Sequence, residues 1–151
     1  MRGVNLKVDI TVELEDIIDL NSEREVRCRV CALKINGKAP AKAGLMDLKS
    51  WHPEDYKKIL NVIRLVASRR EVKSQHVKRG KGRYHDIYEM RGGQARLFFF
   101  FEPVARAIVV CTNLYWKAKP SRKEQDQAFE RSLQFRDIYA AHAARAGEGK
   151  R

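Results

Sequence analysis

The chain has 151 residues, an apolar fraction of 44% and a formal net charge of +12 at pH 7, from 31 Lys and Arg against 19 Asp and Glu. This composition excludes a chain that is disordered beyond its ends, and no apolar run approaches the roughly 18 residues that a membrane span needs. We therefore expect one cytoplasmic domain without a signal peptide, because the N-terminus alternates polar and apolar residues.

The positive charge is distributed unevenly along the chain. Residues 1–25 contain three basic and seven acidic residues, a balance of −4, whereas residues 64–96 contain ten basic and three acidic residues, a balance of +7. This asymmetry predicts a basic face directed at a polyanion, either nucleic acid or an acidic protein. The alternative interpretation is a set of solvated surface charges.

Two strands are predicted near the N-terminus. Residues 4–14 place Val, Leu or Ile at every even position, which is typical of a half-buried strand. A second strand over residues 25–35 ends at the turn signal Asn36-Gly37, so the two strands can pair as an antiparallel hairpin. Cys28 and Cys31 lie on this strand and point to opposite faces, so their C-x-x-C spacing does not predict a metal site.

A helix is predicted from Pro53 to about Ser68, because Pro is favoured at the first helical position and apolar residues recur at helical spacing. The preceding residues, 36–50, are rich in Gly, Pro and small side chains and indicate a loop or a short helix. Beyond the helix, residues 73–83 (KSQHVKRGKGR) predict a basic loop that is able to wrap around a backbone phosphate.

A β-hairpin is predicted from residues 84–91 and 94–102, with Gly92-Gly93 as a two-residue turn. In this register Glu89 lies opposite Arg96, and His85 lies on the same face, opposite Phe100. The other face of the hairpin is apolar and is expected to pack against helices. The face with Glu89 and Arg96 is therefore expected to be open to solvent and to carry the polar function.

The last predicted elements are a strand and a helix. Residues 105–114 form an apolar run typical of a central strand that is covered on both faces, and an aromatic, basic segment follows. The pattern Ser121-x-x-Glu124 is a capping-box signature that predicts the start of a final helix. A flexible tail is expected over residues 145–151.

The order of these elements, together with three short motifs, resembles the RelE/ParE superfamily of type II toxins, and its HigB-like, phage-derived branch most closely. The motifs are the Y-E-M-R strand at residues 88–91, the Arg-containing aromatic strand after the Gly turn, and the segment Trp116-Lys117-Ala118-Lys119-Pro120 before the last helix. The resemblance covers about residues 25–140. It implies a toxin domain over residues 23–144, preceded by an extra N-terminal strand over residues 1–22.

The resemblance implies an α+β fold in which a twisted antiparallel β-sheet packs against helices, with the N-terminal strand or hairpin added to it. It also implies a cytoplasmic toxin that is neutralised by a cognate antitoxin, expected to be a helix-turn-helix protein, and it leaves self-association open. Most characterised members cleave mRNA on the ribosome without a metal or other cofactor. The ParE branch inhibits DNA gyrase and is not a nuclease.

Metal-free RNA cleavage requires a base for the 2′-hydroxyl, cations for the charge that develops on the phosphorane, and an acid for the leaving 5′-oxygen. Arg96 stands where RelE-like nucleases keep a phosphate-binding arginine, and its alternative role is an ion pair with Glu89. Glu89 is a candidate base, since a carboxylate beside an arginine stays ionised. His85 is a second candidate acid or base, or else a surface histidine, and His76 is a weaker candidate of the same kind.

Nucleic-acid contacts are predicted at two further places. The cations of the basic loop are too many in too short a span to serve packing alone, so we expect them to bind backbone phosphates. The aromatic residues after the 105–114 strand are candidates to stack on an unpaired base beside phosphate-binding lysines, or else belong to the core. These predicted nucleic-acid-binding residues are Lys78, Arg79, Lys81, Arg83, Arg91, Tyr115, Trp116, Lys117 and Lys119.

The sequence therefore predicts a HigB/RelE-like toxin that acts as a ribosome-dependent mRNA endoribonuclease. Two alternatives stay open. One is a non-catalytic, ParE-like inhibitor of DNA gyrase or of another protein target. The other is an inactive, prophage-derived remnant that binds RNA weakly.

Overall fold

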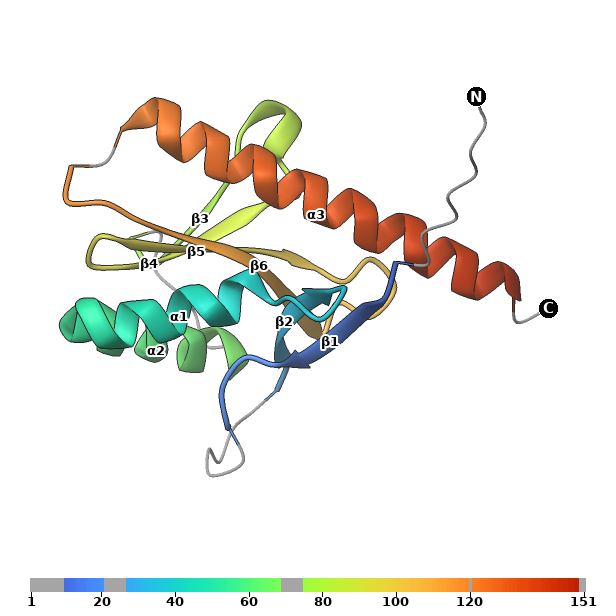
Figure 1. Ribbon diagram of the computed structural model, residues 1–151, viewed down its shortest axis with the longest axis horizontal. Coiled ribbons are helices and arrows are strands. Elements are labelled where there is room, and N and C mark those ends of the chain that lie inside the picture. Colours follow the sequence, from blue (N-terminus) through green and yellow to red (C-terminus); the bar gives the residue numbers. More distant parts are fainter. Residues whose placement is uncertain (1–9, 21–26, 69–74, 120, 150–151) are drawn as a thin grey trace.

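A six-stranded sheet forms the middle of three layers (Figure 1). The computed structural model describes residues 10–20, 27–68, 75–119 and 121–149. Helices α1 (Pro40–Trp51) and α2 (Pro53–Ala67) cover one face of the sheet, and the long helix α3 (Arg122–Gly149) covers the other. The strands are β1 (Val12–Asp16), β2 (Arg29–Ile35), β3 (Val77–Arg79), β4 (Tyr88–Gly92), β5 (Ala95–Phe101) and β6 (Ile108–Trp116), and a 3₁₀ turn, η1 (Gly82–Tyr84), precedes β4.

The sheet is mixed, with the strand order β1-β2-β6-β5-β4-β3. β1 and β2 pair antiparallel, which confirms the predicted N-terminal hairpin within the described residues, and β3 to β6 are antiparallel to one another as well. β2 and β6 are parallel, so the expectation of a wholly antiparallel sheet is wrong at this pair. A parallel pair needs a crossover connection, which here runs through α1, α2 and the β4–β5 hairpin. The α+β class is confirmed.

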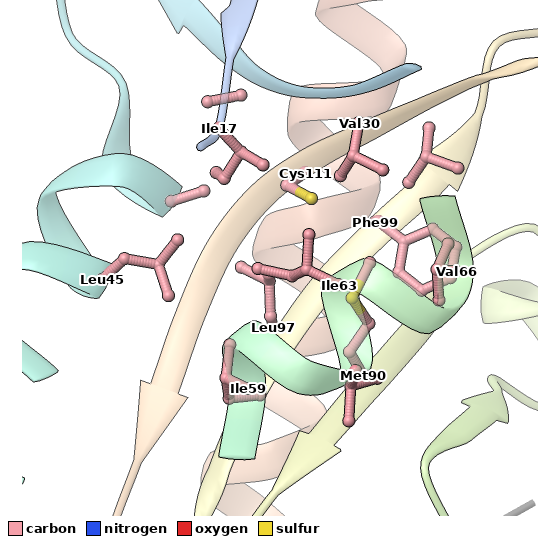
Figure 2. Packing of buried hydrophobic residues seen from close by; sticks show 14 of the residues in the cluster. Ile17, Val30, Leu45, Ile59, Ile63, Val66, Met90, Leu97, Phe99 and Cys111 are labelled. Carbon is pink, nitrogen blue, oxygen red and sulfur yellow. The ribbon is translucent and has the colours of Figure 1, made fainter. Parts of the chain in front are cut away.

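The larger part of the core lies between the sheet and helices α1 and α2 (Figure 2). Ile59 and Ile63, four residues apart on α2, are fully buried in one cluster with Leu97 and Phe99 of β5. This is the hairpin face that the sequence predicts to pack against helices, and the prediction is confirmed. Each such side chain stabilises the fold by about 1.5–3 kcal/mol through its removal from water.

The opposite face of the hairpin, predicted to be open to solvent, is instead covered by α3. Phe98 and Phe100 of β5 are fully buried in a second cluster with Phe129 of α3, whose ring meets that of Phe98 edge to face at 4.9 Å between centroids. Glu89 on the same face has no exposed surface. The prediction fails here because the polar residues share their face with aromatic side chains, and an apolar stripe on α3 removes both from water.

The register of the hairpin also differs from the predicted one. Arg91 lies opposite Arg96, and Glu89 lies opposite Phe98, so Glu89 and Arg96 are not cross-strand partners. The turn is Gly93-Gln94, and Gly93 has a φ of +58°, which favours glycine. Gly92 belongs to the strand, where a Cβ would lie 2.6 Å from the backbone nitrogen of Ile59. Close contact between the hairpin and α2 therefore decides the register.

A β-bulge in β6 fastens α3 to the sheet. Phe98 pairs with Asn113 and Phe99 with Cys111, so Thr112 is an additional residue, and both Thr112 and Asn113 contact α3. The hydroxyls of Thr112 and Ser132 lie 2.6 Å apart, and Nδ2 of Asn113 donates to the carbonyl oxygen of Ala128 at 3.2 Å. Half of the predicted capping box forms at the start of α3, where the backbone N–H of Glu124 donates to Oγ of Ser121 at 3.3 Å. The backbone N–H of Ser121 donates to the hydroxyl of Tyr115 at 3.4 Å and not to the Glu124 carboxylate.

Other elements depart from the predicted bounds. Residues 36–50, expected to be a loop or a short helix, contribute most of the 12-residue helix α1, and the expected basic loop contains the strand β3. Helix α3 continues to Gly149, past the point where a tail is expected. Residues 4–9 of the first predicted strand and residues 73 and 74 of the basic loop lie outside the described residues. Of the helices described, none has the length and apolar character needed to span a membrane.

Candidate functional site

A cleft of about 390 Å³ lies beside the tip of the β4–β5 hairpin, bordered by α2 and by the residues that lead into β3. We name it the basic cleft, because a lysine, two arginines and a histidine line it and, in the described part of the chain, no Asp or Glu does. Its lining residues are Lys58, Asn61, Val62, Gln75, His76, Arg91, Gly92, Gly93 and Arg96.

The two strands of the hairpin bring the arginines of the basic cleft together. Arg91 near the end of β4 and Arg96 near the start of β5 are directly paired residues, so their side chains leave the sheet on the same face. The basic loop adds His76, whose carbonyl oxygen accepts a hydrogen bond from the backbone N–H of Arg91 at 2.6 Å. Lys58 and Asn61 come from α2, where positions three residues apart lie on one side of the helix.

Arg91 is oriented by a buried carboxylate. Its Nε and Nη2 lie 2.7 and 2.6 Å from Oε1 of Glu89, whose side chain is fully buried, while the side chain of Arg91 stays 27% exposed. Nε2 of Gln125 in α3 donates to both carboxylate oxygens of Glu89, at 3.1 and 2.9 Å. Glu89 is therefore enclosed by its partners and positions an arginine, and no ligand in the basic cleft can reach it as a base.

Arg96 is half-buried at the tip of the hairpin, where its Nη1 donates to the carbonyl oxygens of Gly93 and Ala95 at 2.8 and 2.9 Å. Burial lowers the pKa of the Arg96 guanidinium, and the positive charge of Arg91 lowers it further. A guanidinium nevertheless keeps its proton at neutral pH. Two neighbouring cations, both partly removed from water, favour the binding of an anion between them.

Asp55 fastens the hairpin tip to α2 from outside the basic cleft. Its Oδ2 accepts hydrogen bonds from the backbone N–H of Gln94 at 3.2 Å and from Nε1 of Trp116 at 2.8 Å. The Trp116 ring also stacks on His52, with 3.4 Å between ring centroids and an interplanar angle of 15°. His52 thus covers one face of the Trp116 ring, and the indole N–H is bound to Asp55, so the predicted stacking residue is engaged within the protein.

The three predicted catalytic residues do not form one site. His85 follows η1, beyond the end of β4 that is remote from the hairpin tip. Its side chain is 62% exposed, with Nε2 at 3.4 Å from Oδ1 of Asp86 and Nδ1 at 3.1 Å from the carbonyl oxygen of Gly82. Glu89 is buried and His85 is exposed elsewhere on the surface, so of the three only Arg96 lines the basic cleft.

The remaining predicted nucleic-acid-binding residues differ in their exposure and in their ion pairs with other described residues. Lys78, Lys81 and Lys119 are exposed. Two others are neutralised by carboxylates of α3, since Arg83 lies 3.1 Å from Oε1 of Glu130 and Lys117 pairs with Glu124.

Two further predicted residues use their polar groups within the protein. Arg79 donates to the carbonyl oxygen of His85 and lies over the ring of Tyr88, with 5.4 Å between the guanidinium carbon and the ring centroid. The hydroxyl of Tyr115 donates to Oε2 of Glu124 at 3.0 Å. The surface near α3 is consequently less positively charged than the sequence predicts. The basic cleft is therefore the stronger candidate for binding an anion.

Lys58 and Asn61 are the functional candidates that the sequence does not reveal. The sequence pattern predicts only that both lie on the polar, solvent-facing side of α2. The packing of α2 against the hairpin is what brings them close to Arg91 and Arg96. The nearest signal is the pair Gly92-Gly93, because adjacent glycines in a strand end can mark a close backbone approach as well as a turn.

The comparisons with known proteins do not identify a family. A scan against protein-family models finds no match, and a search of curated proteins finds none either.

Within the described ranges, no group of three or more His, Cys, Asp or Glu side chains is placed to hold a metal ion. Cys28 packs in the core on the α1–α2 side, while Cys31, one residue beyond Val30 of that cluster, faces the other side of β2.

Proposed function

We propose that the protein is a RelE/HigB-like toxin that cleaves ribosome-bound mRNA, with the basic cleft holding the phosphodiester. The observation that carries this proposal is the placement of Arg91 and Arg96 side by side in a cleft whose described lining has no carboxylate. Guanidinium groups bind phosphate oxygens through paired hydrogen bonds, so two of them at one point match a phosphate that gains charge during the reaction.

The order of the elements supports the same proposal. From β2 to α3 the chain forms a strand, two helices, four strands that pair antiparallel and a long helix. This contains the order strand, helix, three strands and helix on which the resemblance to the superfamily rests, with α1 and β3 added to it. The strand β1 extends the sheet next to β2 and lies on the far side of the sheet from the hairpin. The described part of the N-terminal strand, β1, is therefore at the opposite edge of the sheet from β3.

In the proposed reaction, Arg91, Arg96 and Lys58 stabilise the negative charge of the phosphorane. His76 lines the basic cleft and takes the proton-transfer role that the sequence assigned to Glu89 or His85: its imidazole accepts the proton of the 2′-hydroxyl, and water protonates the leaving 5′-oxygen. Nδ1 of His76 is buried and has no hydrogen-bond partner among the described residues. Glu89 acts indirectly, because it holds the guanidinium of Arg91 in place.

The test combines induced expression in a bacterial host with primer extension on ribosome-bound mRNA. We expect growth arrest and new 5′ ends in translated messages for the wild-type protein. Arg96→Ala should reduce cleavage about 100-fold or more, as loss of one donor to a developing oxyanion does elsewhere. Arg96→Lys, which keeps the charge but not the paired donors, should fall between the two.

Arg131→Ala is the matched control, since Arg131 is an exposed arginine of α3 that lies over Phe135 and does not line the cleft. It should arrest growth as the wild type does. Growth arrest with intact mRNA and inhibited supercoiling by DNA gyrase would overturn the nuclease proposal in favour of a protein target. No arrest and no cleavage would identify an inactive protein. The helix-turn-helix antitoxin remains the expected partner of the toxin.

A further inference from the structure

A second tryptophan lies at the same end of the molecule as the basic cleft (Figure 1), and its side chain is largely exposed. Trp51 is the last residue of α1 and is 76% exposed, whereas Trp116 is half-buried. Exposure of a large aromatic ring to water is unfavourable unless another molecule covers it. Trp51 is therefore accessible to a ligand at this end of the molecule.

A short series of contacts connects Trp51 with the basic cleft. The ring of its neighbour His52 stacks on Trp116, and Nε1 of Trp116 donates a hydrogen bond to Asp55. Asp55 also accepts a hydrogen bond from the backbone N–H of Gln94 at the hairpin tip. Figure 1 shows the α1–α2 junction, the β4–β5 turn and the end of β6 at one end of the sheet. Lys58 of the basic cleft is five residues after Pro53 in α2, a rise of about 7.5 Å along the helix.

We propose that Trp51 stacks on an unpaired base of the single-stranded RNA whose phosphate occupies the basic cleft, an inference that rests on the proposed function. Single-stranded RNA is bound by aromatic rings that stack on splayed bases beside cations that hold the backbone. Trp116 and Tyr115 are less suited to this role, because His52 stacks on one face of the Trp116 ring and the Tyr115 side chain packs against the core cluster on the α3 side. Trp51 takes the role that the sequence assigned to those two residues.

The surroundings of Trp51 are compatible with a polyanion. Glu54, three residues further along the chain, is paired with Lys57 at 3.5 Å, so its charge is offset. The exposed Lys119 follows Trp116 by three residues, and Nε2 of Gln94 donates to the carbonyl oxygen of Ala118 at 3.1 Å, which ties this segment to the hairpin tip. Lys58 of α2 and Lys119 after β6 are thus exposed cations on the two segments that follow Trp51 and Trp116.

The experiment uses Trp116→Phe, which leaves Trp51 as the single tryptophan of a chain that has two. Its fluorescence is followed during titration with a short oligoadenylate and with an abasic ribose-phosphate oligomer of the same length. We expect both to bind, and only the oligoadenylate to quench the fluorescence. In the otherwise wild-type protein, Trp51→Ala should weaken oligoadenylate binding by about 5- to 100-fold without changing the affinity for the abasic oligomer.

Two variants serve as controls for this loss. Trp51→Phe keeps an aromatic ring and should retain most of the affinity, whereas Met46→Ala removes another exposed apolar side chain of α1, which is 63% exposed, and should have no effect. Wild-type affinity for oligoadenylate in Trp51→Ala, together with weakened binding of both oligomers in Arg96→Ala, would overturn the stacking proposal and leave the basic cleft intact.

The remaining outcomes separate the two proposals further. If neither oligomer binds the wild-type protein, the RNA-binding function and the stacking role both fail. If Trp51→Ala binds RNA normally but no longer arrests growth, Trp51 contacts a protein and the stacking role is wrong.

Discussion

Gly93→Ala tests whether contact between the hairpin tip and α2 shapes the basic cleft. Gly93 has a φ of +58°, and a Cβ at this position would lie 2.5 Å from Cγ of Asp55. The carboxylate must then rotate away. Because its Oδ2 accepts hydrogen bonds from Gln94 and Trp116, the rotation removes both links between the hairpin tip, α2 and β6.

The expected loss of unfolding free energy in Gly93→Ala has two parts. An alanine with a left-handed backbone costs about 1–2 kcal/mol. Loss of hydrogen bonds to a charged group costs a further 1.5–3 kcal/mol or so. We therefore expect Gly93→Ala to lower the free energy of unfolding by about 2.5–5 kcal/mol.

Gly37→Ala is the matched control. Gly37 has a φ of +79°, but a Cβ there would meet no atom within 4 Å, so this variant measures the backbone part alone. Urea unfolding followed by circular dichroism gives the free energy for each variant. In an Asp55→Ala background, the cost of Gly93→Ala should fall to that of Gly37→Ala, since the clashing side chain is absent. Equal costs for the two glycine variants in the wild-type background would refute the reasoning.

Three further predictions concern the groups around the cleft and the core. Glu89→Gln should lower the free energy of unfolding by about 3 kcal/mol, because the substitution removes a fully buried carboxylate and leaves Arg91 without its charged partner. Urea unfolding measures this loss, and an unchanged midpoint would contradict it. Hydrogen bonds from Lys117 and then Tyr115 hold the pKa of Glu124 below its usual 4.5, so their contribution is present above pH 4.5 and is lost as the pH falls. The stability difference between wild type and Glu124→Gln should accordingly shrink in acid, and a constant difference would count against the contacts. Burial raises the pKa of Cys31 to about 11, so a thiol reagent at about pH 8 should label the cysteines only after unfolding; rapid labelling of the folded protein would show that the core opens.

Local patterns in the sequence predict those elements whose residues follow a single period. Helix α2 begins at Pro53 and buries Ile59 and Ile63 as its spacing predicts. The alternation of β5 likewise assigns Leu97 and Phe98 to opposite faces correctly. These predictions succeed because the period of the backbone alone decides which side chains share a face.

The hairpin register could not be predicted, because either Gly92 or Gly93 is able to occupy a turn position. The choice is made by Ile59, which leaves no room for a side chain at position 92 and so holds that residue in the strand. Similarly, no local pattern shows that Gln125, 36 residues away, donates to Glu89 and so makes burial of its charge acceptable. Both features arise between elements distant in the sequence, where periodicity carries no information.

The arrangement of charge around the basic cleft explains why these distant contacts matter for function. Arg91 and Arg96 line the cleft. The carboxylate of Glu89 binds Arg91 and that of Asp55 binds the hairpin tip, and neither carboxylate belongs to the lining. A carboxylate within the lining would repel a phosphate, but a carboxylate behind an arginine fixes its orientation and lowers the entropy lost on binding. The covering helix α3 therefore contributes to the basic cleft although it does not line it, because Gln125 completes the partners of Glu89, which in turn binds the guanidinium of Arg91.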